Sequence, residues 1–568
     1  MPRYAVLATH STSQPESEAG AASAVLQLFN DDEPAGPPLL VFEGQLPAVV
    51  ADLEAHSPRW VMDSTAHWYP KLLAAGSVIE RVWDLSLCRM ILRNSASALA
   101  TPYVNALRST PPEPAGAPAH ALPPPRVSEH QGQLFAEPKD AAGSLESVLA
   151  EFADQRAAVP DTLPGRRLRL LLAAESAGAL IAAEMGANGV PWDADVHHAQ
   201  LESELGPRTP EGTRPPKMEE LAAELRTLLN SPALNPDSQQ ELLRALHRAG
   251  IEATSTRQWE LEELKHPVIT PLLRYKKLSR LASTNGYAWV DAWITGGRFR
   301  PEYVVGGVVT GRWASRGGGA LQIPHTIRDA ARAEDGHVLV VADAAQLEPR
   351  ILAVLARDAK LADAARGRDL YQGIADLGFG GDRAHAKIAM LGAMYGATTG
   401  ESGRLLPQLA RTFPDAVALV EAAARTGEAG GSVSSFLGRG SPEPSADWKR
   451  SQRADSAEAQ RAADAAARSR GRFTRNFVVQ STAAEWALCW LGELRRALNA
   501  AKAEGTDLGQ MVMFLHDEVM LHVPEQHAQR AAELIEASAR AAAELLFGSV
   551  PVDFPVGIAI VKSYADAK

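Results

Sequence analysis

Three islands of strand-like sequence, separated by long helical stretches, constrain most strongly how this chain can fold. They cover residues 300–313, 337–346 and 511–561, where Val, Ile, Leu and Met form short apolar runs. Between the islands, apolar residues recur mostly with the helical period. Strands so far apart in the sequence predict one sheet assembled from distant segments. Helical insertions would then stand on either side of it and form a groove.

The charge balance limits how such a chain could bind nucleic acid. The 568 residues include 57 Lys and Arg against 68 Asp and Glu, for a net charge of −11, and 46% are hydrophobic. This length allows about two to four domains. The composition excludes a mostly disordered chain, a collagen-like fibre and a coiled-coil rod. It also argues against binding nucleic acid by bulk positive charge, so any DNA-binding surface must be local.

Cysteine content and apolar patterning bear on the compartment. With only Cys88 and Cys489, the chain has no disulfide framework and no four-cysteine zinc site. The sequence shows neither a signal peptide nor an uncharged apolar stretch of about 18 residues. We therefore expect a cytoplasmic protein that acts as a monomer and does not contact a membrane.

Acidic residues follow two of the apolar runs. Asp343 ends the run that begins at residue 337, and Asp517 and Glu518 lie between two runs of the last island. A carboxylate in such a position can hold a hard cation. A helix-capping Asp or a polar turn would give the same local patterns.

Two helical segments carry polar and charged residues spaced four apart, which places each set along one helix face. The sets are Arg383, Lys387, Leu391 and Tyr395, and then Arg472, Asn476 and Gln480. Two cations one turn apart can grip a polyphosphate, and the second face suits contacts to phosphates and a nucleic-acid groove. For each segment the alternative is an amphipathic helix whose cations face water.

Together with Thr310-Gly311-Arg312 and the run from Asp343 to Arg350, these motifs follow one another in a familiar order. The chain resembles the polymerase region of family A DNA polymerases, the DNA polymerase I type, from about residue 166 to its end. The resemblance implies an α+β right-hand polymerase domain over residues 163–568. The thumb would cover about 163–296, the palm about 297–352 and 487–568, and the fingers about 353–486. No 5′-nuclease domain is included, which implies a short form.

The family's functional residues map onto named positions. The acids matching Asp343 and Asp517 bind two Mg²⁺ ions, with Mn²⁺ as an alternative, and catalyse an in-line displacement. The Ala344 backbone carbonyl and Glu518 would support this metal site. The implied nucleotide-binding residues are Arg383, Lys387, Leu391, Tyr395, Gln346 and Glu348. The implied DNA-binding residues are Arg312, Arg472, Asn476, Gln480 and His516. Lys387 would also protonate the leaving group, and Glu348 would exclude ribonucleotides.

Several positions depart from the family pattern. Leu391 stands where the family has an aromatic ring, Ala344 and Ala345 replace a Tyr-Ser pair, and Ser481 replaces a Gly. The segment between Asp343 and Lys387 is also short. These departures imply a specialised repair or bypass enzyme rather than a main processive one.

Residues 1–162 alternate strand-like and helical runs, an α/β pattern. Through Trp60 to Leu92, with Asp63 and Asp84, they resemble the ribonuclease H-like 3′–5′ exonuclease domain of the same family. The first strand lacks the usual Asp-x-Glu, and Asp154 is a weak candidate for a further acid, so we expect an inactive domain. The Pro- and Ala-rich residues 111–125 predict an extended linker or surface loop.

The resemblance implies a template-directed DNA polymerase that extends a primer with dNTPs on primer–template DNA, in repair or gap filling. The alternatives are a non-catalytic DNA-binding relic, a polymerase with residual 3′–5′ exonuclease activity, and a nuclease acting through residues 1–162. A single-subunit RNA polymerase is a further alternative, against which Glu348 and the Asp517-Glu518 pair argue.

Overall fold

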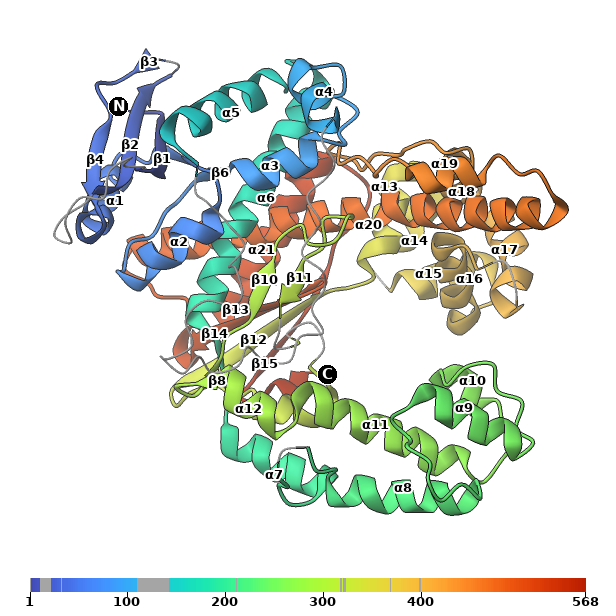
Figure 1. Cartoon of the computed structure of the whole chain (residues 1–568). Helices are drawn as coiled ribbons and strands as arrows, with labels where there is room; N and C mark the ends of the chain where they lie inside the picture. The colour runs from blue at the N-terminus through green and yellow to red at the C-terminus, as the bar shows by residue number, and fades with distance from the viewer. Residues whose placement is uncertain are drawn as a thin grey trace.

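Four strands from distant parts of the chain form the central sheet in the computed structural model (Figure 1). The strand order is β13-β14-β12-β15, and every neighbouring pair is antiparallel. The strands are β12 (His337–Ala344), β13 (Gln510–Leu515), β14 (Glu518–Pro524) and β15 (Val556–Val561). The structure describes residues 2–10, 22–31, 33–109, 143–210, 212–316, 319, 323–367, 369–397 and 400–567. Residues 111–125, predicted as a linker, lie outside these ranges.

The prediction of one sheet from distant strands is confirmed for two of the three islands. The first island instead forms a separate hairpin of β10 (Glu302–Val304) and β11 (Ala314–Arg316). The Tyr303 hydroxyl ties this hairpin to the central sheet by accepting a hydrogen bond from the Phe514 N–H at 2.9 Å.

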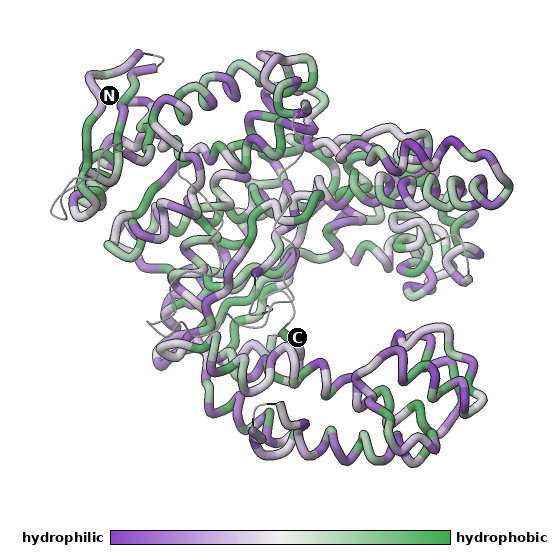
Figure 2. The backbone as a smooth tube through the Cα atoms, viewed as in Figure 1, coloured by the Kyte–Doolittle hydropathy of each residue, from purple (hydrophilic) through white to green (hydrophobic). Residues whose placement is uncertain are grey.

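Both faces of the central sheet are apolar, and each is covered. Val338, Val340, Leu521 and Val523 share a core with the helices on one side. Leu339, Val341 and Met520 face a second core on the other side. Because side chains alternate along a strand, this double burial explains why the runs read as continuously hydrophobic. In Figure 2 the strands at the centre of the molecule are mostly green, the colour of hydrophobic residues.

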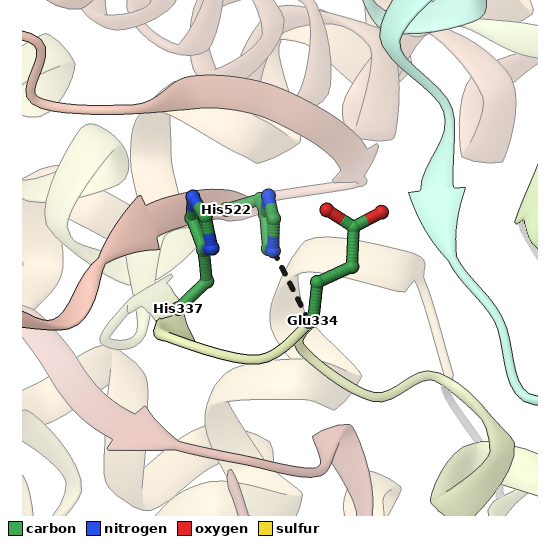
Figure 3. A group of neighbouring side chains, drawn as sticks. All are labelled: Glu334, His337 and His522. Atoms are coloured by element: carbon green, nitrogen blue, oxygen red, sulfur yellow. Dashed lines mark hydrogen bonds between the residues drawn. The ribbon is translucent and has the colours of Figure 1, made fainter.

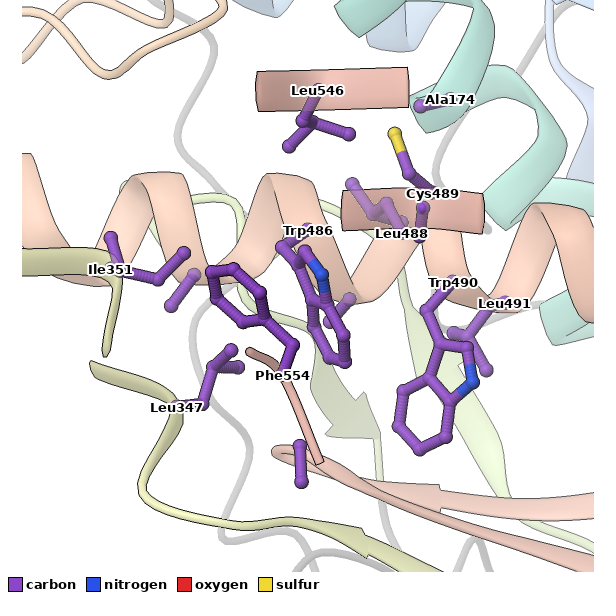
Figure 4. Packing of buried hydrophobic residues seen from close by; sticks show 14 of the residues in the cluster. Ala174, Leu347, Ile351, Trp486, Leu488, Cys489, Trp490, Leu491, Leu546 and Phe554 are labelled. Atoms are coloured by element: carbon purple, nitrogen blue, oxygen red, sulfur yellow. The ribbon is translucent and has the colours of Figure 1, made fainter. Parts of the chain in front are cut away.

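Three long helices cover the first face. They are α6 (Leu163–Asn188), α20 (Ala457–Ala503) and α21 (Ala528–Phe547). Trp486 of α20 stacks on Phe554 with ring centroids 5.5 Å apart, beside Leu347 and Ile351 (Figure 4). The 47 residues of α20 run on unbroken past residue 487, where the sequence predicted a change from fingers to palm.

Two groups of helices project on the same side of the central sheet (Figure 1). The lower lobe contains β7 (Val190–Pro191), α7 (Ala194–Leu205), α8 (Pro216–Leu228), α9 (Gln239–Arg248), α10 (Gln258–Glu262), α11 (Ile269–Asn285), α12 (Tyr287–Trp293), β8 (Ile294–Thr295) and β9 (Arg298–Phe299). The upper block contains α13 (Leu347–Ala356), α14 (Ala359–Ala365), α15 (Leu370–Gly378), α16 (Arg383–Tyr395), α17 (Gly400–Thr412), α18 (Pro414–Glu428) and α19 (Ala446–Ser451).

The N-terminal unit is a mixed sheet flanked by helices. Its strands are β1 (Tyr4–Thr9), β2 (Ala22–Asn30), β3 (Glu33–Pro34), β4 (Leu39–Phe42), β5 (Arg59–Met62) and β6 (Val82–Asp84). Its helices are α1 (Leu46–Glu54), α2 (Thr65–Ala74), α3 (Leu85–Leu92), α4 (Pro102–Ser109) and α5 (Leu145–Ala157). β1 pairs antiparallel with β2 and parallel with β5, and β5 pairs parallel with β6.

Helix α6 connects the N-terminal unit to the central sheet. Its main contacts are with α2, β6, β13 and α20, and its C-terminal end meets the lower lobe where Arg298 donates to the Asn188 carbonyl. The predicted thumb range includes the whole helix. Among the described helices only α6 is long and apolar enough to cross a membrane, with a mean hydropathy of 1.4 over 18 residues. Half of that window is buried inside the protein, and a core helix of a soluble protein passes the same test.

Candidate active site

Two carboxylates meet at one end of the central sheet. Asp343 is near the end of β12, and Asp517 lies in the two-residue turn between β13 and β14. The Ala344 N–H donates a hydrogen bond to the Asp517 carbonyl at 2.9 Å, which fixes this turn against β12. Burial, and then the charge of Asp343, raise the pKa of Asp517 to about 6. A buried site in which two carboxylates repel each other in this way is suited to a divalent cation.

Glu518 is held beside the pair by a buried partner. It lies directly opposite Asp343 in the strand register, and its Oε1 accepts a hydrogen bond from the Tyr564 hydroxyl at 2.5 Å. Only 2% of Glu518 is exposed, so its side chain is part of the interior, in keeping with the expected supporting position.

Helix α16 presents one polar face and one buried face. It begins after Asp382, whose side chain accepts from the His385 N–H, and it ends at Gly396 with φ of +73°. Arg383, Lys387 and Tyr395 are exposed and Leu391 is half-buried; the opposite face is buried and comprises Ala386, Ala389, Met390, Ala393 and Met394. The predicted four-residue spacing along one face is therefore confirmed.

Asp369 was not singled out from the sequence, and it joins α16 to the end of β12. Its carboxylate accepts from Arg383 at 2.8 and 3.2 Å and from the Gln346 side chain at 2.8 Å. Arg383 is thus held by a carboxylate in this structure. The only sequence signal for Asp369 is its place as the capping residue of α15, where it accepts from the Gln372 N–H.

Glu348 lies at the centre of a second polar cluster. It forms an ion pair with Arg312 and accepts a hydrogen bond from the Tyr395 hydroxyl at 2.6 Å. Gln480 of α20 also contacts Tyr395 through a side-chain hydrogen bond. These contacts bring together four predicted site residues from four distant segments.

Helix α20 contributes fewer free cations than its sequence indicates. Arg472 is exposed and its stem packs on Gly396, while Asn476 and Gln480 are half-buried. Arg475, by contrast, is buried, pairs with Glu421 and donates to the Ala393 carbonyl at 2.8 Å. Arg470 donates to the carbonyls of Gly431 and Pro442. These contacts engage Arg470 and Arg475 in the upper block, so neither is free to bind a phosphate.

His516 occupies the exposed turn position before Asp517. Its φ of +60° is in the left-handed region, as in a tight two-residue turn. Burial of its ring and the nearby Arg312 charge lower the pKa of His516, so the imidazole is neutral at pH 7.

Comparisons with known proteins agree with this geometry. The sequence model of DNA polymerase family A matches residues 213–566, which is more than half of the chain. The chain belongs to DNA polymerase family A. It is 28% identical over 436 residues to a thermostable DNA polymerase I of Thermus filiformis, covering 68% of this chain and 47% of that protein. The Thermus aquaticus enzyme is 26% identical over 383 residues, covering 60% and 42%.

A solved structure extends the likeness to the whole fold. The POL domain of Pol1 from M. smegmatis, in complex with DNA primer-template and dNTP, superposes with a TM-score of 0.69 at 18% identity. This match covers 100% of this chain and 96% of that one. The chain spans about half the length of the curated polymerases that it matches in sequence.

The acids of the N-terminal unit in this family A member have structural partners. Asp63 accepts from the N–H groups of Ser64 and Gly143 and from the Trp68 indole. Asp84 is buried and accepts from the Thr65 and Leu87 N–H groups. Asp154 is exposed on α5. None of these acids belongs to a group of three possible metal ligands among the described residues.

Proposed function

We propose that this chain is a template-directed DNA polymerase that adds deoxynucleotides to a primer 3′-OH. The observation that carries the proposal is the meeting of Asp343 and Asp517 near the α16 face that holds Arg383 and Lys387. Membership of family A and the fold likeness to a primer-template complex support it. The chain spans about half of its curated relatives, so its activity and its substrates are both part of this proposal.

Two Mg²⁺ ions, or Mn²⁺ in their place, fit the carboxylate pair. Burial, and then the like charge of Asp343, raise the pKa of Asp517, and a dication would relieve this charge repulsion. When bound, such ions supply activation of the primer hydroxyl and neutralisation of the triphosphate. Asp343 and Asp517 would hold them, with the Ala344 carbonyl nearby and Glu518 supporting the turn.

The α16 face would bind the incoming triphosphate. Lys387 is exposed one turn after Arg383, so the two cations can reach neighbouring phosphates. Lys387 can also donate a proton to the departing pyrophosphate. Arg383 must exchange its Asp369 partner for a phosphate, which makes nucleotide binding compete with an ion pair.

The Glu348 cluster would bind the sugar and base. Glu348 and Gln346 lie at the start of α13, next to the acids, and Tyr395 is fixed by its bond to Glu348. A carboxylate there would exclude a ribose 2′-OH. Leu391 offers an aliphatic surface in place of a ring, so contact with the sugar would be weaker.

Primer and template would be held without reading of their sequence. The residues in position for this are Arg312, Arg472, Asn476, Gln480 and His516. Contacts of this kind in the minor groove distinguish base pairs poorly, as a copying enzyme requires.

The arrangement of the elements supports a division of the chain into subdomains. We assign the central sheet to the palm (about 297–352 and 487–568), the upper block to the fingers (about 353–486) and the lower lobe to the thumb (within 163–296). The mixed β-sheet topology and its flanking helices support a ribonuclease H-like exonuclease relic in residues 1–162. A cytoplasmic monomer in repair or gap filling agrees with two buried free cysteines, Cys88 and Cys489.

Primer extension on a labelled hairpin tests the proposal. With Mg²⁺ or Mn²⁺ and dNTPs, the wild type should lengthen the primer, and NTPs should support little extension. Asp517→Asn should abolish it, whereas Asp455→Asn, at an exposed position outside the site, should leave it unchanged. No extension by the wild type with either metal would favour the non-catalytic relic instead.

A further inference from the structure

A cluster of metal-ligating side chains lies at the other end of the central sheet. It comprises Glu334, His337 and His522, whose ligand atoms all lie within 4.8 Å of one another. In the part of the chain that the structure describes, no other three such residues are grouped this closely. Figure 3 shows the two imidazole rings facing each other beside the Glu334 side chain.

The strand register brings the two histidines together. His337 is opposite Pro524 and His522 is opposite Leu339, so the two side chains are diagonal neighbours on one face of the sheet. Their ring centroids are 4.4 Å apart, with planes 15° from parallel. His522 is 4% exposed, an unusual degree of burial for a ring that carries two polar nitrogens.

Neighbouring hydrogen bonds leave the same nitrogen of each ring unprotonated. His337 Nδ1 lies 3.1 Å from the Asp335 carbonyl, so this nitrogen donates its proton and Nε2 keeps its lone pair. A carbonyl that accepts from one ring nitrogen and leaves the other free, as at His337, is typical of histidines that ligate metals. His522 Nε2 accepts from the Glu334 N–H at 3.3 Å, so a metal ion bound through this nitrogen would replace that hydrogen bond.

The cations around the cluster have other partners. Arg298 pairs with Glu334, but it also donates to the Asn188 and Gly189 carbonyls at 3.2 and 3.1 Å. It therefore keeps two acceptors if the Glu334 carboxylate turns away. Lys562 is paired with Glu525 at 2.7 Å, which offsets its charge near His337.

We propose that Glu334, His337 and His522 form a binding site for one transition-metal dication, with Zn²⁺ as the best match. Two imidazoles and a carboxylate suit Zn²⁺ rather than Mg²⁺, and a water would complete four ligands. Tetrahedral Zn²⁺ places its ligand atoms about 3.4 Å apart, so the donors must close in by roughly 1 Å, with rotation of a ring out of the stack.

Such an ion would join β12, β14 and the loop before β12. His337 and Asp343 are six residues apart on β12, which is about 20 Å. The site is therefore separate from the carboxylate pair and does not depend on polymerase activity. Its expected effect is on the stability of the central sheet, because an ion that binds only the folded state raises the unfolding temperature.

Cobalt(II) spectroscopy on the tag-free full-length chain tests the proposal, with excess Mg²⁺ to occupy the carboxylate pair. We expect one equivalent of Co²⁺ to give intense visible absorption, displaced by Zn²⁺, and Zn²⁺ to raise the unfolding temperature. His337→Asn and His522→Ala should each weaken binding about tenfold or more. His56→Ala, at an exposed position in the N-terminal unit, should bind as the wild type does.

Two results would overturn the proposal. One is visible absorption no stronger than that of aqueous Co²⁺ at saturating metal. The other is equal Co²⁺ affinity in the wild type and in His337→Asn, with circular dichroism showing that the variant is folded. His337 is half-buried at the start of its strand, so its replacement should not prevent folding.

Discussion

The acids of the central sheet and those of the N-terminal unit lie at similar places in their sheets, but their surroundings differ. Asp517 faces Asp343, and burial with this like charge raises the pKa of Asp517. Asp63 accepts three hydrogen bonds, two from backbone N–H groups, and Asp84 accepts two backbone N–H groups. The proposed catalytic pair therefore keeps a charge repulsion that a cation would relieve, whereas Asp63 and Asp84 act as hydrogen-bond acceptors within the fold of the N-terminal unit.

Replacing one acid in each unit by its amide should have very different effects on the rate of dNTP incorporation. Asp517→Asn should slow dNTP incorporation about a thousandfold, or about 4 kcal/mol of transition-state free energy, because the metal loses a ligand. Asp63→Asn should stay within about twofold of the wild type, because the hydrogen bonds that its carboxylate accepts come from within the N-terminal unit. Single-turnover incorporation measures both. Equal losses of incorporation rate in the two variants would contradict the difference between the two pairs of acids.

The pH profile should reveal the carboxylate pair. Asp517 has a raised pKa of about 6, so protonation below pH 6 opposes cation binding. At subsaturating Mg²⁺ the incorporation rate should fall about tenfold per pH unit below 6 and level off above it. Raising Mg²⁺ tenfold should move the midpoint to lower pH, because metal and proton compete. A midpoint of the pH profile that does not change with the Mg²⁺ concentration would exclude Asp517 as the titrating group.

The same raised pKa has a consequence for folding without metal. The folded state holds the Asp517 proton more tightly than the unfolded chain, so this stabilisation is complete below about pH 4. It is lost as the pH rises through about 6. Urea unfolding in EDTA at pH 5 and pH 7 should show a smaller loss for Asp517→Asn than for the wild type.

Asp84 should matter for stability and not for catalysis. Asp84→Ala removes the cap of α3 and leaves the Thr65 N–H without its acceptor, so unfolding of the N-terminal unit should become easier by about 1–3 kcal/mol. Urea titration monitored by tryptophan fluorescence measures this, with Asp52→Ala on the exposed side of α1 as the control. If the incorporation rate fell by more than the loss of folded protein explains, Asp84 would have a role in catalysis.

The smallest effect is expected at Asp369. Asp369→Asn keeps the α15 cap but weakens the hold on Arg383, so the KM for dNTP should fall by about two- to fivefold. That range corresponds to an exposed ion pair of about 0.4–1 kcal/mol. Asp363→Asn, whose exposed side chain pairs with the exposed Arg366, is the matched control. A rise in KM would show that Asp369 positions Arg383 for the nucleotide instead of competing with it.

Sequence reasoning reached the features that depend on local order and spacing. Apolar runs ending in Asp343 and Asp517 predicted strands that meet, and four-residue spacing predicted the polar face of α16. It missed features set by long-range packing. The 300–313 island was expected in the central sheet, but it contributes β10 to a separate hairpin, which contacts β13 through the Tyr303 hydroxyl and the Trp313 ring.

The sequence also does not show which charged residues are buried or paired with distant partners. Arg475 reads as one more cation in a basic run, and only the fold shows it paired with Glu421 inside the upper block. Asp369 lies 26 residues after Asp343 (369 − 343) with no motif around it, so its role required the contact with Gln346. His337 and His522 are likewise unremarkable in sequence, because only the strand register makes them neighbours.

One gel with a primer that carries a 3′ mismatch tests the contrast between the two units most directly. A primer labelled at its 5′ end and mismatched at its 3′ end is incubated with the wild-type chain and Mg²⁺, with and without dNTPs, beside a fully paired primer. We predict extension of the paired primer with dNTPs and no shortening of either primer without them. Shortening that Asp63→Asn abolishes, or no extension of the paired primer, would contradict the account.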